Sequence, residues 1–170
     1  MKWQHDALAR VKSIQSDVRT ILGPPEEALP SVTEAIVPRT LVRGTRGYIE
    51  RVANQINGTF ENGWYDACAV MIRRLLETLI IEVYEHYSLA HKVKNQSGDF
   101  LFLGDLIDQC LQETAWNLSR DCRTYLPKLK DIGNKSAHSR RFNATKADIA
   151  PLASHIRFVV QELVYLAGLK

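Results

Sequence analysis

The sequence lacks a hydrophobic run long enough to suggest insertion into a membrane. Its most apolar segment, LLETLIIEVY, is interrupted by Glu77 and Glu82, whereas a helix needs about 20 consecutive apolar residues to cross a bilayer. The first residues, MKWQHDALARVK, carry charges throughout and contain no apolar core of a secretion signal. We therefore expect a cytoplasmic protein without a membrane partner.

Cysteine is scarce, and metal-ligand spacing is missing. Cys68, Cys110 and Cys122 lie far apart, without a C-x-x-C pair, and each falls in an apolar helical pattern. His86 and His91 would lie on different faces of a helix, with no carboxylate or cysteine at ligand spacing. These positions predict buried thiols, with a disulfide pair as the alternative, and we expect no metal site and no cofactor.

A large excess of charge is also absent. The 170 residues contain 22 Lys and Arg against 19 Asp and Glu, a formal net charge of +3. Such a small charge does not favour a polyanion-binding surface over the whole molecule. Contact with nucleic acid would have to come from local clusters, and basic residues do gather between Arg120 and Arg141.

No segment alternates polar and apolar residues with a period of two, and hairpin turn signals are missing. The sequence predicts an all-α protein, an up-down helical bundle formed by residues 41–170. Residues 1–22 form an N-terminal amphipathic helix in this prediction, and residues 23–40 form a proline-rich linker. The apolar stripe of the first helix would pack on its own bundle or on another subunit, and the sequence leaves both open. The stripe consists of Trp3, Ala7, Val11, Ile14, Val18 and Ile21.

Within the bundle, the pattern predicts a short helix over residues 45–56 that Asn57 and Gly58 close. A long helix over residues 62–89 is apolar on nearly every face, so we expect it to run through the middle of the bundle. Arg73, Arg74 and Glu77 interrupt this apolar character. They form either an internal ion pair or a solvated edge of that helix.

Three further helices are predicted in the second half of the chain. They cover residues 102–111, a long segment that starts near Ala115, and a last segment that starts near Asp148. Pro151 falls in the first turn of the last helix, where a missing N–H is tolerated.

Residues 128–141, KLKDIGNKSAHSRR, hold most of the chemically useful side chains of the sequence. In a helix Asn134 and His138 share one face, and Gly133 falls on an apolar stripe where two helices can approach closely. Gly133 and Asn134 could instead form a helix C-terminus, but the stripe continues to Ala137, which favours one long helix. The basic residues here, candidates for binding nucleic acid or another anion, are Lys128, Lys130, Lys135, Arg140 and Arg141.

Three features together resemble the HEPN (higher eukaryotes and prokaryotes nucleotide-binding) superfamily: AVMIRRLLETLI, LKDIGNKSAH, and a helix after a turn that contains Thr and Asp. The likeness covers roughly residues 60–168. It is strongest to a domain family of unknown function found with restriction and other defence genes. The resemblance implies a helical bundle that forms homodimers, with the polar motifs of two subunits near the two-fold axis.

Active members of that superfamily are metal-independent ribonucleases whose motif consists of Arg, a polar residue such as Asn, and His. The chain has Asn134 and His138 at the matching positions, but Gly133 stands where the Arg belongs. Metal-free RNA cleavage needs a base and a cation that stabilises the charged phosphorane. His138 would be the base, with Arg140 or Arg141 as the cation, or it would serve as a structural hydrogen-bonding residue.

The resemblance therefore predicts a non-catalytic HEPN-like module that dimerises and binds a nucleotide, RNA or a protein partner in a prokaryotic defence system. A metal-independent ribonuclease that uses His138 is the first alternative. A structural accessory subunit, whose basic residues are only solvated, is the second.

Overall fold

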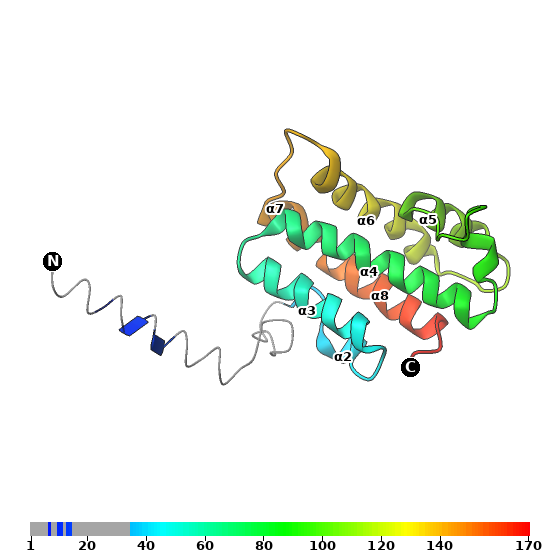
Figure 1. The fold of residues 1–170 in the computed structure, drawn as a ribbon, viewed down its shortest axis with the longest axis horizontal. Helices are drawn as coiled ribbons and strands as arrows, with labels where there is room; N and C mark the ends of the chain where they lie inside the picture. The colour runs from blue at the N-terminus through cyan, green and yellow to red at the C-terminus, as the bar shows by residue number, and fades with distance from the viewer. Residues whose placement is uncertain (1–6, 8–9, 12, 15–34) are drawn as a thin grey trace.

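The computed structural model describes residues 7, 10–11, 13–14 and 35–170, and residues 35–170 form an all-α helical bundle (Figure 1), as the sequence predicts. The described part contains one isolated bridge, between Lys94 and Phe100, and no strand. The predicted helix over residues 1–22 and linker residues 23–34 lie outside the described residues, apart from the five named positions before residue 15. The described elements are α2 (Arg39–Val42), α3 (Gly47–Glu61), α4 (Tyr65–His86), η1 (Ala90–Val93), α5 (Leu103–Gln112), α6 (Arg120–His138), α7 (Lys146–Ile149), η2 (Ala150–Leu152) and α8 (Ala153–Leu166).

Helix α4 is the centre of the bundle, as its all-round apolar sequence predicts. It packs against α3, α5, α6 and α8, and one face with Ala67, Val70 and Arg74 remains exposed. Its apolar side chains are removed from solvent at successive turns, and truncating one to Ala typically costs about 2–5 kcal/mol. The buried apolar residues of α4 are Cys68, Ala69, Ile72, Leu75, Leu76, Leu79, Ile80, Val83 and Tyr84.

The predicted end of the second helix at Asn57 and Gly58 is wrong, because α3 continues to Glu61. Asn57 is buried and does not cap the helix. Its side-chain oxygen accepts a hydrogen bond from the Val37 N–H at 3.0 Å, and its amide nitrogen donates to the Val37 carbonyl at 2.8 Å. The extra turn places Phe60 in the core.

The core begins before residue 41. Ile36 and Val37 are 1% and 0% exposed, although both fall within the predicted linker. Arg157 of α8 holds the chain where it joins the bundle, because its guanidinium donates to the carbonyl of Ala35 at 2.7 Å and to that of Ile36 at 3.4 Å. Residues 35–37 are therefore part of the bundle.

Helices α6 and α8 each begin later than the sequence indicates. Ser119 caps α6, since its hydroxyl accepts a hydrogen bond from the Cys122 N–H at 3.1 Å, and Glu162 in turn accepts bonds from the Ser119 N–H and hydroxyl. The predicted last helix is divided into α7, the short 3₁₀ helix η2 with Pro151 in its first turn, and α8. Proline cannot donate a backbone hydrogen bond, which is consistent with the break.

The three cysteines are free and buried, as predicted from their apolar surroundings. Burial raises the pKa of Cys68 and of Cys110 to about 12, and it also raises the pKa of Cys122. None of the described helices combines the length and apolar character needed to span a bilayer.

Candidate functional site

Helix α6 carries the candidate site, and it continues through Gly133 to His138. The prediction of one long helix is therefore confirmed, and the alternative of a C-terminal cap at Gly133 is wrong. Gly133 is buried on the apolar stripe of α6 with Leu126, Leu129 and Ile132.

The missing side chain of Gly133 lets α6 approach α4 closely. A Cβ atom at this position would lie 2.9 Å from the Cβ of Arg73 and 3.2 Å from the carbonyl oxygen of Ala69. Neither neighbour is the mobile end of a side chain, so a larger residue would push the helices apart. The contact also brings the next residue, Asn134, against Arg73.

Arg73 links the two helices through its guanidinium. It donates a hydrogen bond to the side-chain oxygen of Asn134, and it forms an ion pair with Glu77 one turn further along α4 at 3.3 Å. The Arg73 side chain is only 17% exposed. Arg74 is exposed, and it forms no ion pair among the described residues. The predicted internal ion pair thus consists of Arg73 and Glu77 without Arg74.

His138 stands one helical turn after Asn134 at the end of α6 and is exposed. Lys130, one turn before Asn134, shares this face, because residues four apart on a helix lie above one another. Lys135 is also exposed on α6, and Arg140 and Arg141 are exposed just after the helix ends. We call Lys130, Lys135, His138, Arg140 and Arg141 the basic end of α6.

Lys128, which the sequence groups with these residues, lies elsewhere. It is ten residues from His138, or about 15 Å along the helix axis. Its ammonium group lies over the ring of Tyr125 at 5.8 Å. The ring of Tyr125 in turn stacks on His155 of α8, with 3.9 Å between the ring centroids. Lys128 therefore belongs to the junction of α6 with α8.

The segment after α6 is held against the start of α4. Asp66 accepts a hydrogen bond from the Ala144 N–H at 2.9 Å. Thr145 and Asp148 form a capping box at the start of α7, and the hydrogen bond from the Thr145 side chain lowers the pKa of Asp148. Arg140 and Arg141 thus lie on a connection that is fixed at both ends.

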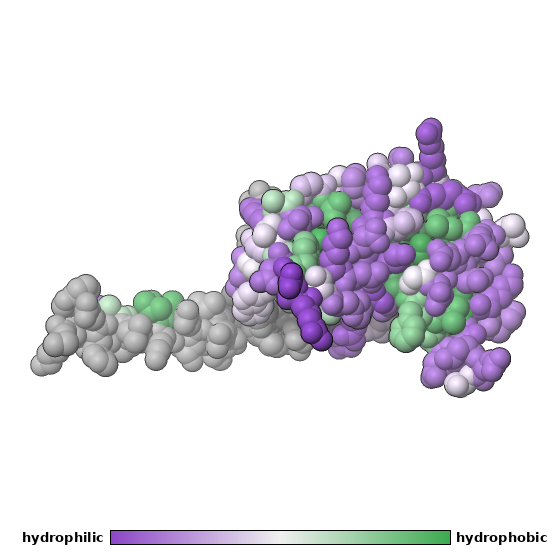
Figure 2. Space-filling model, turned by 90° about the horizontal axis from the view of Figure 1, so that it is seen from above, coloured by the Kyte–Doolittle hydropathy of each residue, from purple (hydrophilic) through white to green (hydrophobic). Residues whose placement is uncertain are grey.

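The arrangement is suited to anion binding at the surface. Figure 2 views the molecule from the side on which α5 and α6 lie in Figure 1, and hydrophilic side chains cover most of that face, with smaller hydrophobic areas between them. Phosphate groups bind such clusters of Lys and Arg by charge and hydrogen bonding. Among the described residues no group of three or more His, Cys, Asp or Glu side chains could hold a metal ion.

The role of Arg73 could not be found from sequence spacing. It lies 61 positions before Asn134 in the chain, so only the packing of α4 on α6 brings the two together. Gly133 on an apolar stripe was the one useful indication in the sequence. It predicts that another helix approaches α6 closely at Gly133, but it does not identify the residue of that helix.

Comparison with known families places most of this structure in one domain. The model of a domain of unknown function, DUF4145, matches residues 54–170. The chain belongs to the DUF4145 family. The DUF4145 region runs from the middle of α3 to the end of the chain and includes both Arg73 and the basic end of α6. Neither a curated protein nor a solved structure matches the chain.

Proposed function

We propose that this DUF4145 protein is a non-catalytic, HEPN-like module that binds RNA through the basic end of α6. The observation that carries the proposal is that the polar side chains on this face fall into two groups, one bound between the helices and one exposed. Arg73 and Asn134 bind each other between the helices, whereas His138, Lys135, Arg140 and Arg141 are exposed and Lys130 is partly exposed. A single RNA strand could place its phosphates on these cations.

The state of Arg73 argues against catalysis. A ribonuclease of this type needs a cation that is available to the phosphorane. Among the described residues, the guanidinium that binds the motif is that of Arg73, which is largely buried, forms an ion pair with Glu77 and donates to Asn134. Its charge is therefore paired with Glu77 within α4, and one of its hydrogen bonds joins α4 to α6. Loss of one such stabilising group commonly costs two to three decades in rate.

Titration of a fluorescein-labelled single-stranded RNA with the protein tests the proposal. We expect the affinity to fall steeply with added salt, with a slope on logarithmic axes of about −0.7 for each phosphate neutralised. Lys135→Ala and Arg141→Ala should each weaken binding and make the slope shallower. Lys128→Ala is the matched control, because it removes the same charge from the α6–α8 junction and should change little. No binding at low salt would contradict the proposal and favour a structural accessory subunit.

A metal-independent ribonuclease is the second candidate. It is favoured because the guanidinium of Arg73 lies beside Asn134, although Gly133 occupies the position of the motif Arg. In that case Arg73 would act as the cation and His138 as the base. We expect RNA to remain intact for hours in the presence of EDTA. Cleavage that His138→Ala abolishes, with unchanged circular dichroism, would overturn the non-catalytic assignment.

We also propose that the chain forms a homodimer and acts with a partner in a prokaryotic defence system, as the HEPN resemblance implies. The all-α bundle is compatible with that resemblance. Light scattering at tens of micromolar tests the homodimer, and identification of proteins that co-purify with the tagged chain from its native host tests the defence partner.

A further inference from the structure

Trp64 is an exposed aromatic residue at the turn between α3 and α4. Its side chain is 65% exposed, although an indole ring gains much apolar stabilisation when it is buried. The backbone holds the residue in place, because the Trp64 N–H donates to the Thr59 carbonyl at 2.8 Å and its carbonyl accepts from the Cys68 N–H at 2.9 Å. The fold therefore fixes Trp64 at the start of α4 but leaves most of its ring in solvent.

Trp64 lies at the same end of the bundle as the basic end of α6. Helices α4 and α6 run antiparallel (Figure 1), and Gly133 of α6 approaches Ala69 of α4. From this contact Trp64 is five residues back along α4, and His138 is five residues onward along α6. Each step covers about 7.5 Å in the same direction, so the two residues lie at one level along the helix axes. Figure 1 shows the α3–α4 turn and the α6–α7 connection at this end.

The segment that follows α6 connects these two positions. Its Ala144 N–H donates to the carboxylate of Asp66, two residues after Trp64, at 2.9 Å. Lys146, at the start of α7, places its ammonium group over the ring of Phe60 in the last turn of α3, at 5.9 Å. Positive charge therefore extends from the basic end of α6 towards the turn that carries the indole.

The negative charge beside Trp64 decides which part of an RNA the indole can bind. Glu61 is exposed three residues before Trp64, and Asp66 follows two residues after it. These carboxylates repel a phosphate group placed at the indole, but the base of a nucleotide is uncharged. Bases stack on aromatic side chains whatever their identity, because every base has a π-face. The surface thus separates a place for phosphates, on the basic end of α6, from a place for a base, on Trp64.

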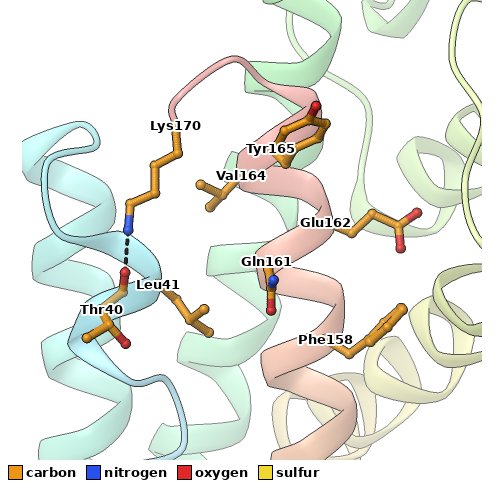
Figure 3. Close-up of a pocket in the computed structure, with 8 residues that line it drawn as sticks. All are labelled: Thr40, Leu41, Phe158, Gln161, Glu162, Val164, Tyr165 and Lys170. Carbon is orange, nitrogen blue, oxygen red and sulfur yellow. Dashed lines mark hydrogen bonds between the residues drawn. The ribbon is translucent and has the colours of Figure 1, made fainter.

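Other exposed aromatic rings are less suited to this role. Phe158 and Tyr165 line a hollow of about 500 Å³ between α2 and α8, where Glu162 and Lys170 supply one charge of each sign (Figure 3). Phe102 is 79% exposed, but it stands just before α5, toward the opposite end of the bundle (Figure 1). Neither place joins an exposed ring to the basic end of α6.

We infer that Trp64 stacks on an unpaired base of an RNA whose phosphates lie on the basic end of α6. The inference rests on the proposed RNA binding and adds the class of RNA to it. A base inside a duplex is stacked on its neighbours, whereas an unpaired base can be turned out onto an aromatic side chain. The protein therefore binds single-stranded RNA more tightly than a duplex of the same sequence.

Titration of labelled single-stranded and duplex RNA with variants of the full chain tests the inference. Trp64→Ala should weaken binding of the single strand by about 5- to 150-fold, the effect of losing one stacked base. The salt slope should not change, because no charge is removed, and the preference over duplex should disappear. Trp64→Phe keeps a ring and should recover part of the affinity. Phe102→Ala is the matched control and should change neither quantity.

Tryptophan fluorescence gives a second measurement that does not require removal of Trp64. In a Trp3→Phe background, Trp64 and Trp116 are the remaining tryptophans, and Trp116 is only 4% exposed. Unlabelled single-stranded RNA should quench the exposed indole, and the quenching should saturate at the same concentration as binding of the labelled strand. Duplex RNA should leave the fluorescence nearly unchanged.

The possible results separate this inference from the proposed function. Salt-dependent RNA binding that Trp64→Ala does not weaken, without quenching, would overturn the inference and leave the RNA-binding proposal intact. No RNA binding at low salt would overturn both. If light scattering gave the Trp64→Ala chain half the mass of the wild type, the indole would belong to the contact between two copies, and its role in stacking would be wrong.

Discussion

Arg73 of α4 donates a hydrogen bond to the side-chain oxygen of Asn134 of α6, across the contact that Gly133 makes possible. We expect Asn134→Ala to destabilise the protein by about 1–3 kcal/mol, because it leaves a largely buried guanidinium with one partner fewer. A double-mutant cycle with Arg73→Ala, measured by urea denaturation, should give a coupling of at least about 0.5 kcal/mol. The cycle with the exposed Arg74→Ala is the control and should show no coupling. Equal results for the two arginines would contradict the assigned pair.

Two glycines in helices should respond in opposite directions to substitution by alanine. Gly133→Ala should lower the free energy of unfolding by about 1–3 kcal/mol, because its Cβ would meet the Arg73 Cβ at 2.9 Å. Gly58→Ala in α3 meets nothing within 4 Å. It should raise the free energy of unfolding by about 0.4–1 kcal/mol by restricting the unfolded chain. Chemical denaturation measures both, and a Gly133→Ala protein as stable as the wild type would show that α4 and α6 do not approach this closely.

The buried thiols should make stability fall in alkaline solution. The pKa of Cys68 and of Cys110 rises from 9.0 to about 12 on burial, so the unfolded chain loses these protons at a lower pH than the folded chain does. Stability is therefore retained below about pH 9 and decreases between pH 9 and 12, by about 1.4 kcal/mol per pH unit for each thiol.

Comparison with the Cys68→Ala/Cys110→Ala variant isolates this effect from other groups that titrate in the same range. The variant should be less stable overall but show a shallower decrease of the free energy of unfolding between pH 9 and 11. Parallel curves for the two proteins would mean that the thiols ionise equally well in the folded state.

The bundle should tolerate removal of residues 1–34 but not of residues 1–38. The longer deletion removes Ile36 and Val37 from the core and leaves the buried Asn57 side chain without its backbone partners. We expect the longer deletion to be less stable by several kcal/mol, since two apolar side chains and two hydrogen bonds are lost. Thermal melts followed by circular dichroism compare the two. Equal melting temperatures would place the boundary of the bundle after residue 38.

Local patterns were enough to predict the helices that bury a continuous stripe. Apolar residues on all faces of residues 62–89 predict a central helix, and α4 is central. The stripe from Cys122 to Ala137 correctly favours continuation of α6 through Gly133. In both cases the side chains that decide the structure are neighbours in the sequence.

Contacts between distant residues were not predictable in this way. Asn57 looks like a helix stop because its usual local role is to cap, and only the arrival of Val37 gives its side chain another partner. Arg73 and Asn134 form their hydrogen bond because of the way α4 packs on α6. The grouping of Lys128 with the other cations follows from closeness in sequence, but ten residues of helix separate it from His138.

The attachment of residues 35–37 also has a mechanical consequence. If a partner pulled on the N-terminal segment, the tension would reach the bundle at Ala35 and be shared by the guanidinium of Arg157 and the side chain of Asn57. These groups belong to α8 and α3, the last helix of the chain and one of the first, so the load would be divided between the two ends of the bundle's sequence.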